Sequence, residues 1–546
     1  MTLLERPDLA PPPRHPWLNA LRRPLPATLL ALGAVLAAIV LAICQGSAYW
    51  NGLDRGDSPL DGFAGTVEPR PPRLARRVVF VILDGLRVDR SRTLPTLNRL
   101  RAQGASRELM TSFPTTSIPQ YYAALSGIEP RLSGARTNRF AAFHWHLDSV
   151  IGRAAAAGLS VATMGPHRQW FPPGFARLFR FSGFGNDRYE ANLRQALATG
   201  ADLTVLVDDR VDHAGHNHGG ASPEYAVAAV RSDEQLASVL AGLDLTRDAI
   251  LVTADHGHTD RGGHGGAEPE VMQVPFVAAG AGIRPGRYAG AEMIDVGPTL
   301  AALLGVPAPT ATHGRPLTDL LDMQPEAKAT LERAAAARHL AVETYLAGRV
   351  QAEAAHEAAR RRVRLGVLAV VLAGVVLALR RARVGAHALA GGLAYVATFV
   401  GVCALAGGRL SLSWARTEGA VIVPLVIATL AGGVVYLVLA GRTRLARERG
   451  TAVPELLAAA ALAALPWAVV TAIQGAAPGL LIASPSWTAA GLWGGTPLIC
   501  FAPWALLDVA IVLARRRWGA ARPAVAAPGY DEVAEQVPAV AQAAGE

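Results

Sequence analysis

The chain has 546 residues, of which 51% are hydrophobic and only 17% are charged. This composition is too apolar for an ordinary soluble protein, so membrane-spanning segments are expected. The formal net charge of +9 comes from arginines that cluster beside apolar runs, which indicates membrane topology and gives no sign of a nucleic-acid partner. All three cysteines, Cys44, Cys403 and Cys500, also lie in apolar runs, so any metal in the polar part of the chain must be held by histidine or carboxylate side chains.

The N-terminal part of the chain is expected to carry a membrane anchor. Residues 1–26 are rich in proline and arginine, which predicts a disordered segment in the cytoplasm. The apolar run 27–48 follows Arg22 and Arg23, and this basic flank predicts that the chain leaves the membrane on the outer side. We interpret the run as an uncleaved transmembrane anchor, because a signal peptide, the alternative, would have a shorter apolar core and a small-residue cleavage site.

After a linker at 49–74, residues 75–320 alternate short apolar runs with helical patterns. The runs are nearly continuous in valine, isoleucine, leucine and alanine, which is typical of buried parallel strands. The expected strands are 77–83, 160–165, 203–207, 249–254 and 274–279. The helical patterns between them predict an α/β domain with a mostly parallel sheet and helices on both faces. In such a domain the chemistry gathers at the carboxyl ends of the strands.

The C-terminal part is predicted to form a helical connector at 321–364 and a membrane domain of about five helices at 365–514. The expected membrane-spanning segments are 365–379, 387–407, 420–440, 453–473 and 488–514. If all of these segments span, every large arginine cluster falls on one side, which the positive-inside rule makes the cytoplasm. The tail at 515–546 then lies in the cytoplasm. We therefore expect a multi-pass protein of the cell membrane whose α/β domain is extracytoplasmic.

Two stretches of the α/β region place oxygen-bearing side chains beside expected strand or helix ends. Asp84 ends the strand at 77–83, so its carboxylate emerges at the carboxyl edge of the sheet. Residues 112–122 form a cluster of hydroxyl side chains between prolines, followed by a helical pattern. A hydroxyl at a helix N-terminus lies where backbone N–H groups favour an anionic phosphate. Taken singly, each stretch is also consistent with plain helix capping.

Two histidine-rich loops follow later strands of the same region. Residues 211–219 (VDHAGHNHG) come after the strand at 203–207, and residues 253–266 (TADHGHTDRGGHGG) come at the end of the strand at 249–254. Six histidines in two strand-end loops are hard to explain by packing. The interleaved aspartates and glycines argue against a surface metal-storage tract. Carboxylates and neutral imidazoles together make a compact site for Zn²⁺ or Mn²⁺.

These stretches resemble the alkaline phosphatase superfamily, in particular its type I phosphodiesterase/nucleotide pyrophosphatases and the ethanolamine phosphate transferases of glycolipid (GPI) anchor synthesis. Residues 114–119 (PTTSIP), followed by Asn138, resemble the nucleophile region of the diesterases. This resemblance makes Ser117 the expected nucleophile, with Thr116 as the alternative, and Asn138 a phosphate-binding side chain. The short distance along the chain from Asp255 to the last histidine is similar to the transferases. The resemblance implies an alkaline-phosphatase-like fold for residues 75–320.

The resemblance also implies two divalent metal ions, expected to be zinc with manganese as the alternative. The implied ligands of one metal are Asp84, Ser117, Asp255 and His256. The implied ligands of the other metal are Asp212, His216 and His264. The remaining histidines of the two loops, His213, His218 and His258, are then not ligands. They orient ligands or contact the substrate, or they are simply solvated.

The function implied by the resemblance is that of a membrane-anchored phosphotransferase or phosphodiesterase. The substrate would be a phosphodiester, such as a phosphoethanolamine-type head group or another lipid- or glycan-linked phosphate, and the reaction would pass through a phosphorylated Ser117. Membrane lipids are the expected partners, and the oligomeric state is left open. One alternative is a nucleotide pyrophosphatase/phosphodiesterase, and a non-enzyme alternative is an extracytoplasmic metal- or ligand-binding membrane protein. A sulfatase is not expected, because Tyr121 stands where the sulfatase motif requires arginine.

Overall fold

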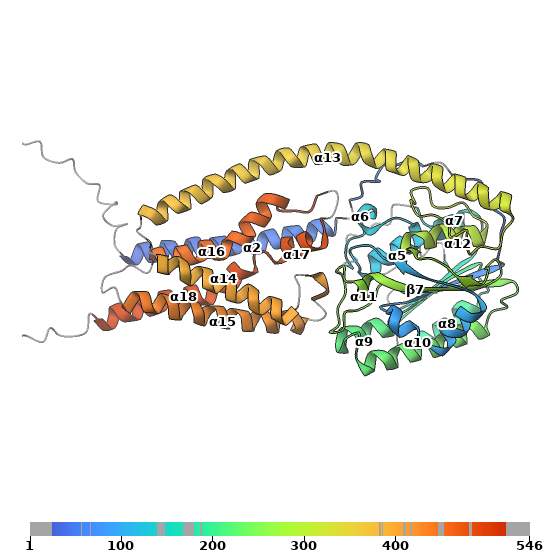
Figure 1. The fold of residues 1–546 in the computed structure, drawn as a ribbon, viewed down its shortest axis with the longest axis horizontal. Coiled ribbons are helices and arrows are strands. Elements are labelled where there is room, and N and C mark those ends of the chain that lie inside the picture. Colours follow the sequence, from blue (N-terminus) through green and yellow to red (C-terminus); the bar gives the residue numbers. More distant parts are fainter. Residues whose placement is uncertain are drawn as a thin grey trace, which may run out of the picture.

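The computed structural model describes residues 24–55, 57–65, 67–138, 148–166, 179–185, 188–381, 384, 386–407, 411–414, 418–445, 453–479 and 483–519. An α/β domain lies at one end of an elongated molecule and a bundle of long helices lies at the other, as Figure 1 shows. Most of the expected N-terminal segment and of the C-terminal tail lies outside the described residues. The domain boundaries given above therefore stay predictions.

The α/β domain is built on a sheet that has nine strands within the described residues, in the order β4-β3-β5-β1-β6-β7-β2-β8, with β9 paired to β2. The strands are β1 Arg77–Leu83, β2 Ala105–Met110, β3 Val161–Gly165, β4 Phe179–Phe184, β5 Leu203–Asp208, β6 Asp248–Thr253, β7 Gln273–Gly280, β8 Gly286–Arg287 and β9 Ala291–Glu292. The central strand β1 is parallel to both of its neighbours, β5 and β6. The prediction of a mostly parallel sheet is confirmed, although β7 runs antiparallel to β6 and to β2.

Helices cover both faces of this sheet, with α5, α7 and α12 on one side and α8, α9 and α10 on the other (Figure 1). The helices of the domain are α3 Val88–Ser91, α4 Pro95–Gln103, α5 Ser117–Ser126, α6 Pro130–Ser133, α7 Val150–Ala156, α8 Tyr189–Ala198, α9 Arg210–His218, α10 Pro223–Ala241, α11 Pro269–Met272, the 3-10 turn η4 Met293–Asp295 and α12 Val296–Leu304. Because both faces are covered, β5 and β6 are buried along their whole length and β1 along all but its first residue.

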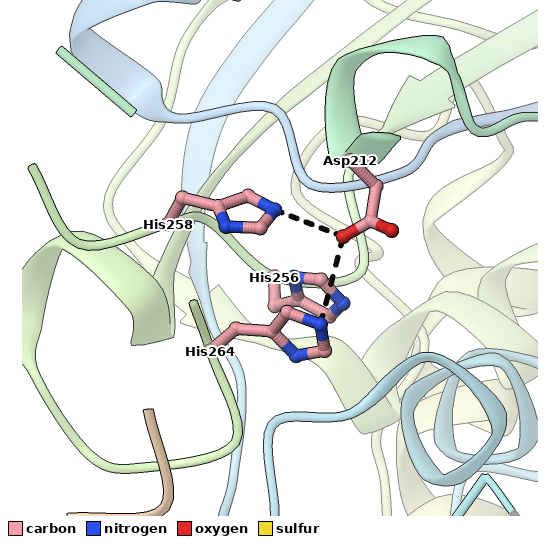
Figure 2. Close-up of side chains that lie close together, drawn as sticks. All are labelled: Asp212, His256, His258 and His264. Atoms are coloured by element: carbon pink, nitrogen blue, oxygen red, sulfur yellow. Dashed lines mark hydrogen bonds and ion pairs between the residues drawn. The ribbon is translucent and has the colours of Figure 1, made fainter. Parts of the chain in front are cut away.

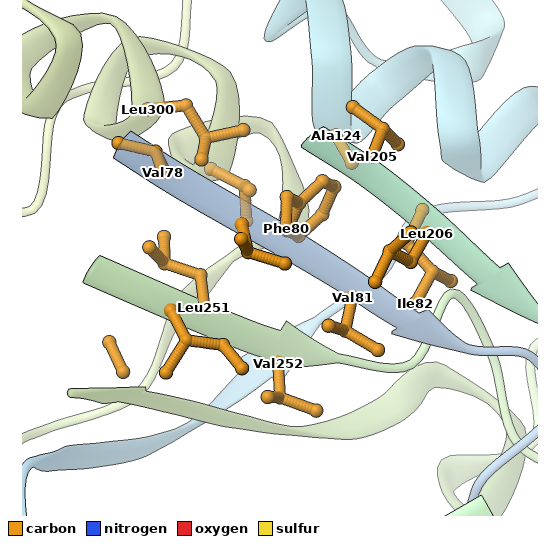
Figure 3. Close-up of a cluster of buried hydrophobic side chains, with 14 of the residues drawn as sticks. Val78, Phe80, Val81, Ile82, Ala124, Val205, Leu206, Leu251, Val252 and Leu300 are labelled. Carbon is orange, nitrogen blue, oxygen red and sulfur yellow. The ribbon is translucent and has the colours of Figure 1, made fainter. Parts of the chain in front are cut away.

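The hydrophobic core of the domain forms around β1. Figure 3 shows Val78 and Phe80 of this strand together with Leu300 of α12 and Ala124 of α5. Phe80 is fully buried, so its replacement by alanine is expected to cost about 3–5 kcal/mol of stability. This packing fixes the three central strands, and it therefore fixes the positions of the loops that leave their carboxyl ends.

The helical bundle contains the apolar segments expected from the sequence. Its helices are α2 Pro24–Leu53, α13 Pro325–Arg381, α14 Ala386–Gly407, the 3-10 turn η5 Leu412–Trp414, α15 Glu418–Leu445, α16 Val453–Gln474, α17 Pro485–Trp493 and α18 Thr496–Gly519. Within the described residues, five helical stretches are long and apolar enough to cross a membrane: those in α2, α13, α15 and α16, and the stretch Pro485–Ile511. The apolar part of α14, Leu389–Leu405, is shorter. The sidedness of these helices stays a prediction.

Two details of the bundle differ from the segments expected above. The connector and the first C-terminal apolar segment are one continuous helix, α13, which has 57 residues and extends beside both parts of the molecule in Figure 1. Near its N-terminal end α13 packs on the α/β domain, where Val342 and Leu346 contact a cluster that includes Leu60 and Ile128. The expected segment 488–514 is divided into α17 and α18 by a turn at 494–495.

Candidate metal centre

The three central strands bring the predicted site residues to one edge of the sheet. Asp84 directly follows β1, Asp212 lies in α9 four residues after β5 ends, and Asp255 follows β6. Residues at the carboxyl ends of these strands are paired in register, Leu83 with Asp208 and Ile82 with Thr253. The carboxyl ends of adjacent parallel strands meet at the same edge, so loops far apart in the sequence converge there.

Glycines allow these loops to approach each other closely. Gly85 has a φ of +75°, and a Cβ on it would lie 2.9 Å from the Cα of Asp212. Its N–H donates a hydrogen bond of 3.0 Å to Asp255 Oδ1. In α9, a Cβ on Gly215 would overlap the imidazole ring of His258. A larger residue at either position would push the candidate ligand loops apart.

One group of candidate ligands surrounds the Nε2 atom of His256. This nitrogen lies 3.4 Å from Asp84 Oδ1, 3.2 Å from Asp255 Oδ2 and 3.5 Å from Ser117 Oγ. The two carboxylate oxygens are buried, and neither has a hydrogen-bond partner among the described residues. Four side chains expected to share a metal are therefore brought together, with their donor atoms directed at a common point.

A second group surrounds Asp212 Oδ1. The Nε2 atoms of His258, His216 and His264 lie 2.8, 3.5 and 3.5 Å from this oxygen. Figure 2 shows His258 and His264 directed at Asp212 from the loop that follows β6. The rings of His256 and His264 stack with their centroids 3.7 Å apart, so the two groups adjoin. By proximity alone, two overlapping sets of side chains could hold a metal, Asp212–His256–His258–His264 and Asp84–Asp255–His256.

The contacts of the Nδ1 atoms of His256 and His264 determine which ring nitrogen of each carries the proton. His264 Nδ1 lies 2.8 Å from the carbonyl oxygen of Thr115, and His256 Nδ1 lies 3.1 Å from the carbonyl oxygen of Gly257. A carbonyl oxygen only accepts hydrogen bonds, so each Nδ1 carries the proton. The lone pair of each Nε2 then faces the centre, the arrangement usual for metal-binding histidines.

His258 has the opposite arrangement. Its Nδ1 accepts a hydrogen bond of 3.1 Å from the N–H of Gly263, so its Nε2 carries the proton and donates to Asp212 Oδ1. Burial acts to raise the pKa of Asp212, but this hydrogen bond and the nearby histidines lower it below its ordinary value. His258 therefore orients the Asp212 carboxylate and offers no lone pair to a metal.

The protonation of the buried groups fits a cation site. Burial raises the pKa of Asp255 to about 7, and burial together with the charges of neighbouring carboxylates raises the pKa of Asp84. Burial also lowers the pKa of His264 to about 3 and lowers the pKa of His256, so both rings are neutral at physiological pH. Closely spaced buried carboxylates and neutral imidazoles are the donors that divalent metal ions favour. The residues present therefore fit divalent metal ions.

Ser117 lies at the edge of this centre, at the first position of α5. Asn138 contacts it from the following segment, because Asn138 Nδ2 lies 3.5 Å from Ser117 Oγ. Asn138 Oδ1 in turn accepts a hydrogen bond of 2.9 Å from the N–H of Ile118. The side chains of Ser117 and Asn138 thus lie together at the N-terminus of α5. An anionic group bound there would also contact the candidate metal ligands.

Thr116, the alternative nucleophile, is the N-cap residue of α5. Its Oγ1 is buried and has no hydrogen-bond partner in the part of the chain that the structure describes. Its methyl carbon lies 3.4 Å from the position that a Cβ on Gly265 would occupy. The contact between Ser117 Oγ and His256 favours Ser117 over Thr116.

The other two histidines of the first loop do not join the centre. His213 and His218 lie on α9 with Asp212 and His216, but they line a groove between α8, α9 and α10. His213 Nε2 lies 3.3 Å from Asp209 Oδ2, and its side chain is 59% exposed. Of the three histidines left without a metal in the sequence analysis, only His258 belongs to the site.

Two contributors were not assigned a role by the sequence analysis. The hydroxyl of Tyr121 donates a hydrogen bond to Asp84, and the carbonyl group of Thr115 holds His264. Tyr121 comes four residues after Ser117 in an expected helix, a spacing that puts both side chains on one face. The role of Tyr121 could have been predicted from this spacing. The role of the Thr115 carbonyl group could not, because every residue has a backbone carbonyl.

The α/β domain is similar to several known proteins. Residues 78–266 match the family model described as type I phosphodiesterase / nucleotide pyrophosphatase. The catalytic subunit of human GPI ethanolamine phosphate transferase 3 is 28% identical over 306 residues, which cover 48% of this chain and 28% of the human protein. GPI ethanolamine phosphate transferase 2 of Aspergillus fumigatus is 23% identical over 336 residues, covering 53% of this chain and 43% of the fungal protein. Murine ectonucleotide pyrophosphatase / phosphodiesterase 5 aligns with a TM-score of 0.38 and 15% identity, covering 45% of this chain and 100% of the murine one.

The α/β domain thus belongs to the alkaline phosphatase superfamily. The chain spans less than half the length of the two transferases compared above, 28% and 43%. Within the superfamily, the α/β domain lies in the branch that contains the type I phosphodiesterases and the GPI ethanolamine phosphate transferases.

Proposed function

We propose that the protein is a membrane-anchored phosphotransferase or phosphodiesterase that acts on a lipid- or glycan-linked phosphodiester, such as a phosphoethanolamine head group. The observation that carries the proposal is the convergence of Asp84 Oδ1, Asp255 Oδ2 and Ser117 Oγ on His256 Nε2 within 3.5 Å. Two divalent metal ions, expected to be zinc, complete the site. One would be held by Asp84, Ser117, Asp255 and His256, and the other by Asp212, His216 and His264.

In this proposal Ser117 is the nucleophile. Its Oγ attacks the phosphorus, the bond to the leaving oxygen breaks, and a phosphoserine remains. Asn138 Nδ2, beside the N-terminus of α5, holds a non-bridging oxygen of the phosphate. Bound divalent metal ions would supply the positive charge that stabilises the negative charge developing on the reacting oxygens. An acceptor oxygen then displaces Ser117, and the reaction is a hydrolysis if the acceptor is water and a transfer if it is an alcohol.

A lipid-linked substrate is favoured by the short connection between the site and the membrane helices. Leu412 Cβ lies 3.5 Å from the position that a Cβ would take on Gly265, the residue next to His264. Leu412 follows the end of α14 at Gly407 by five residues, which can extend over at most about 17 Å. In the proposed arrangement, in which α14 enters the membrane, the centre would lie near the lipid head groups. A soluble substrate would need no such proximity.

The experiment uses the full chain in lipid nanodiscs. It compares turnover of phosphatidylethanolamine, a lipid-linked phosphodiester, with turnover of a nucleotide diester and of a small chromogenic diester, each with and without a chelator. The proposal expects chelator-sensitive release of the phosphoethanolamine group, either to water or to an added alcohol. Preferential turnover of the nucleotide diester would favour the nucleotide pyrophosphatase/phosphodiesterase alternative, in line with the family description. No metal-dependent turnover of any of the three would favour the non-enzyme alternative.

A further inference from the structure

A loop of the membrane domain contacts the loop that carries His264. The N–H of Gly266 donates a hydrogen bond of 2.9 Å to Ser413 Oγ, and Ser413 Oγ donates one of 2.7 Å to Glu268 Oε2. Ser413 belongs to the η5 turn between α14 and α15, and it is only 3% exposed. We call this hydrogen-bonded chain of Gly266, Ser413 and Glu268 the Ser413 clip.

Thr115, which precedes Thr116 and Ser117, holds Gly265 and Gly266 from the other side. Thr115 Oγ1 accepts a hydrogen bond of 3.0 Å from the N–H of Gly265 and donates one of 2.7 Å to the carbonyl oxygen of Gly266. The carbonyl oxygen of Thr115 accepts the hydrogen bond from His264 Nδ1. The backbone next to His264 is therefore fixed between the nucleophile loop on one side and the membrane domain on the other.

Glycine is needed at both positions for this contact. Gly265 has a φ of +102°, a conformation that other residues rarely adopt. A Cβ on Gly266 would overlap Ser411 Oγ and Glu268 Oε2, so only a glycine lets the η5 turn approach the backbone. Residues 263–266 (GHGG), which end the second histidine loop, thus provide the candidate metal ligand His264 and also the two glycines that contact the η5 turn.

We propose that the Ser413 clip positions His264, so that the membrane domain holds one of the candidate metal ligands in place. This inference rests on the proposed function, because it assigns Ser413 and Glu268 as positioning residues of the same centre. A hydroxyl and a carboxylate are suited to the role, since the hydroxyl accepts from the backbone N–H and donates to the carboxylate at the same time. The metal centre is then assembled from both parts of the chain.

The test compares Ser413→Ala, Glu268→Ala and the double variant with the wild-type chain, all as full-length protein in nanodiscs. Glu270→Ala is the matched control, because it removes a carboxylate two residues from Glu268 and outside the clip. Hydrogen–deuterium exchange of residues 263–268 and the rate at which a chelator removes zinc are measured without any substrate. Glu268→Ala removes one hydrogen bond of the clip and Ser413→Ala removes both, so each single variant is expected to show at least about fivefold faster exchange and zinc release.

The double variant sharpens the test. Both substitutions break the same hydrogen-bonded chain, so the double variant is expected to exceed either single variant by less than twofold, and the control to match the wild type. Wild-type exchange and zinc release in Ser413→Ala would overturn the inference. If the wild-type chain turns over no diester at all, the proposed function fails, yet the exchange data still decide whether the clip exists.

Discussion

Tyr121 donates a hydrogen bond through its hydroxyl to Oδ2 of Asp84, and thereby ties the helix that begins at Ser117 to the end of the central strand. Both side chains are fully buried. With Oδ2 held in this way, the other oxygen of Asp84 faces His256, 3.4 Å from its Nε2. The tyrosine thus fixes which carboxylate oxygen is presented to the centre.

Replacing Tyr121 with phenylalanine removes this hydrogen bond and keeps the ring that packs in the core. Zinc affinity is expected to fall about 10–100-fold, the usual effect of losing a group that orients a metal ligand. Competition with a chromophoric chelator measures the change. Tyr122→Phe is the control, because it removes a hydroxyl from the adjacent buried tyrosine. Equal affinities of the two variants would show that Tyr121 does not orient Asp84.

Replacing Ser117 with alanine is expected to lower turnover by at least about 10⁴-fold while the metal content stays near that of the wild type. The reason is that the nucleophile is lost while most of the candidate ligands remain. Steady-state kinetics and metal analysis of the purified protein provide the measurement. Thr116→Ala is the paired variant and should keep most of the activity. Activity that persists in Ser117→Ala would move the nucleophile to Thr116.

Replacing His258 with phenylalanine keeps a ring of similar size against Gly215 but removes the donor to Asp212. We expect zinc affinity to fall about tenfold or more, because the carboxylate loses the hydrogen bond that orients it. His213 lies on the exposed side of α9, the helix that carries Asp212, so His213→Phe should change the zinc affinity less than twofold. Isothermal titration of both variants decides the matter, and a strong effect of His213→Phe would contradict the assigned roles.

Zinc affinity should depend on pH through Asp255. In the metal-free protein the pKa of this carboxyl is raised to about 7, so below that pH a proton must leave before a cation binds. The pKa of His264 is lowered to about 3, so this ring is already neutral and does not compete. Affinity is therefore expected to increase as the pH rises through 7, and the raised pKa of Asp84 acts in the same direction. Titrations between pH 5.5 and 8 in buffers of different ionisation enthalpy measure the released protons, and a constant affinity over this range would refute the expectation.

The strands that the sequence predicts correctly are those whose residues are nearly all apolar. β1, β5 and β6 are such runs, and their continuous apolar character reflects burial on both faces. β2 was missed because it includes Arg107 and Glu108 and alternates buried with partly exposed positions. The antiparallel direction of β7 could not be predicted, because an antiparallel strand buried on both faces has the same composition as a parallel one.

The candidate site was predictable where its residues directly follow strands. Asp84 and Asp255 stand at strand ends, so their convergence follows from a parallel sheet. The role of His258 cannot be predicted from the sequence, because it depends on a hydrogen bond from the backbone of Gly263. Ser413 lies 147 residues from the glycine it contacts, in a segment with no catalytic pattern, and only the folded chain brings the two together.

The continuity of α13 has a mechanical consequence. This helix is about 86 Å long at 1.5 Å per residue, and Arg338, near its start, donates to the carbonyl oxygen of Thr312 in the α/β domain. With no break between this anchoring point and the apolar half, the helix acts as a stiff rod. If the apolar half crosses the membrane as proposed, a bilayer of different thickness would change its tilt and, with it, the height of the candidate centre above the lipid surface. The thickness of the host membrane would then be one of the determinants of which phosphate groups come within reach.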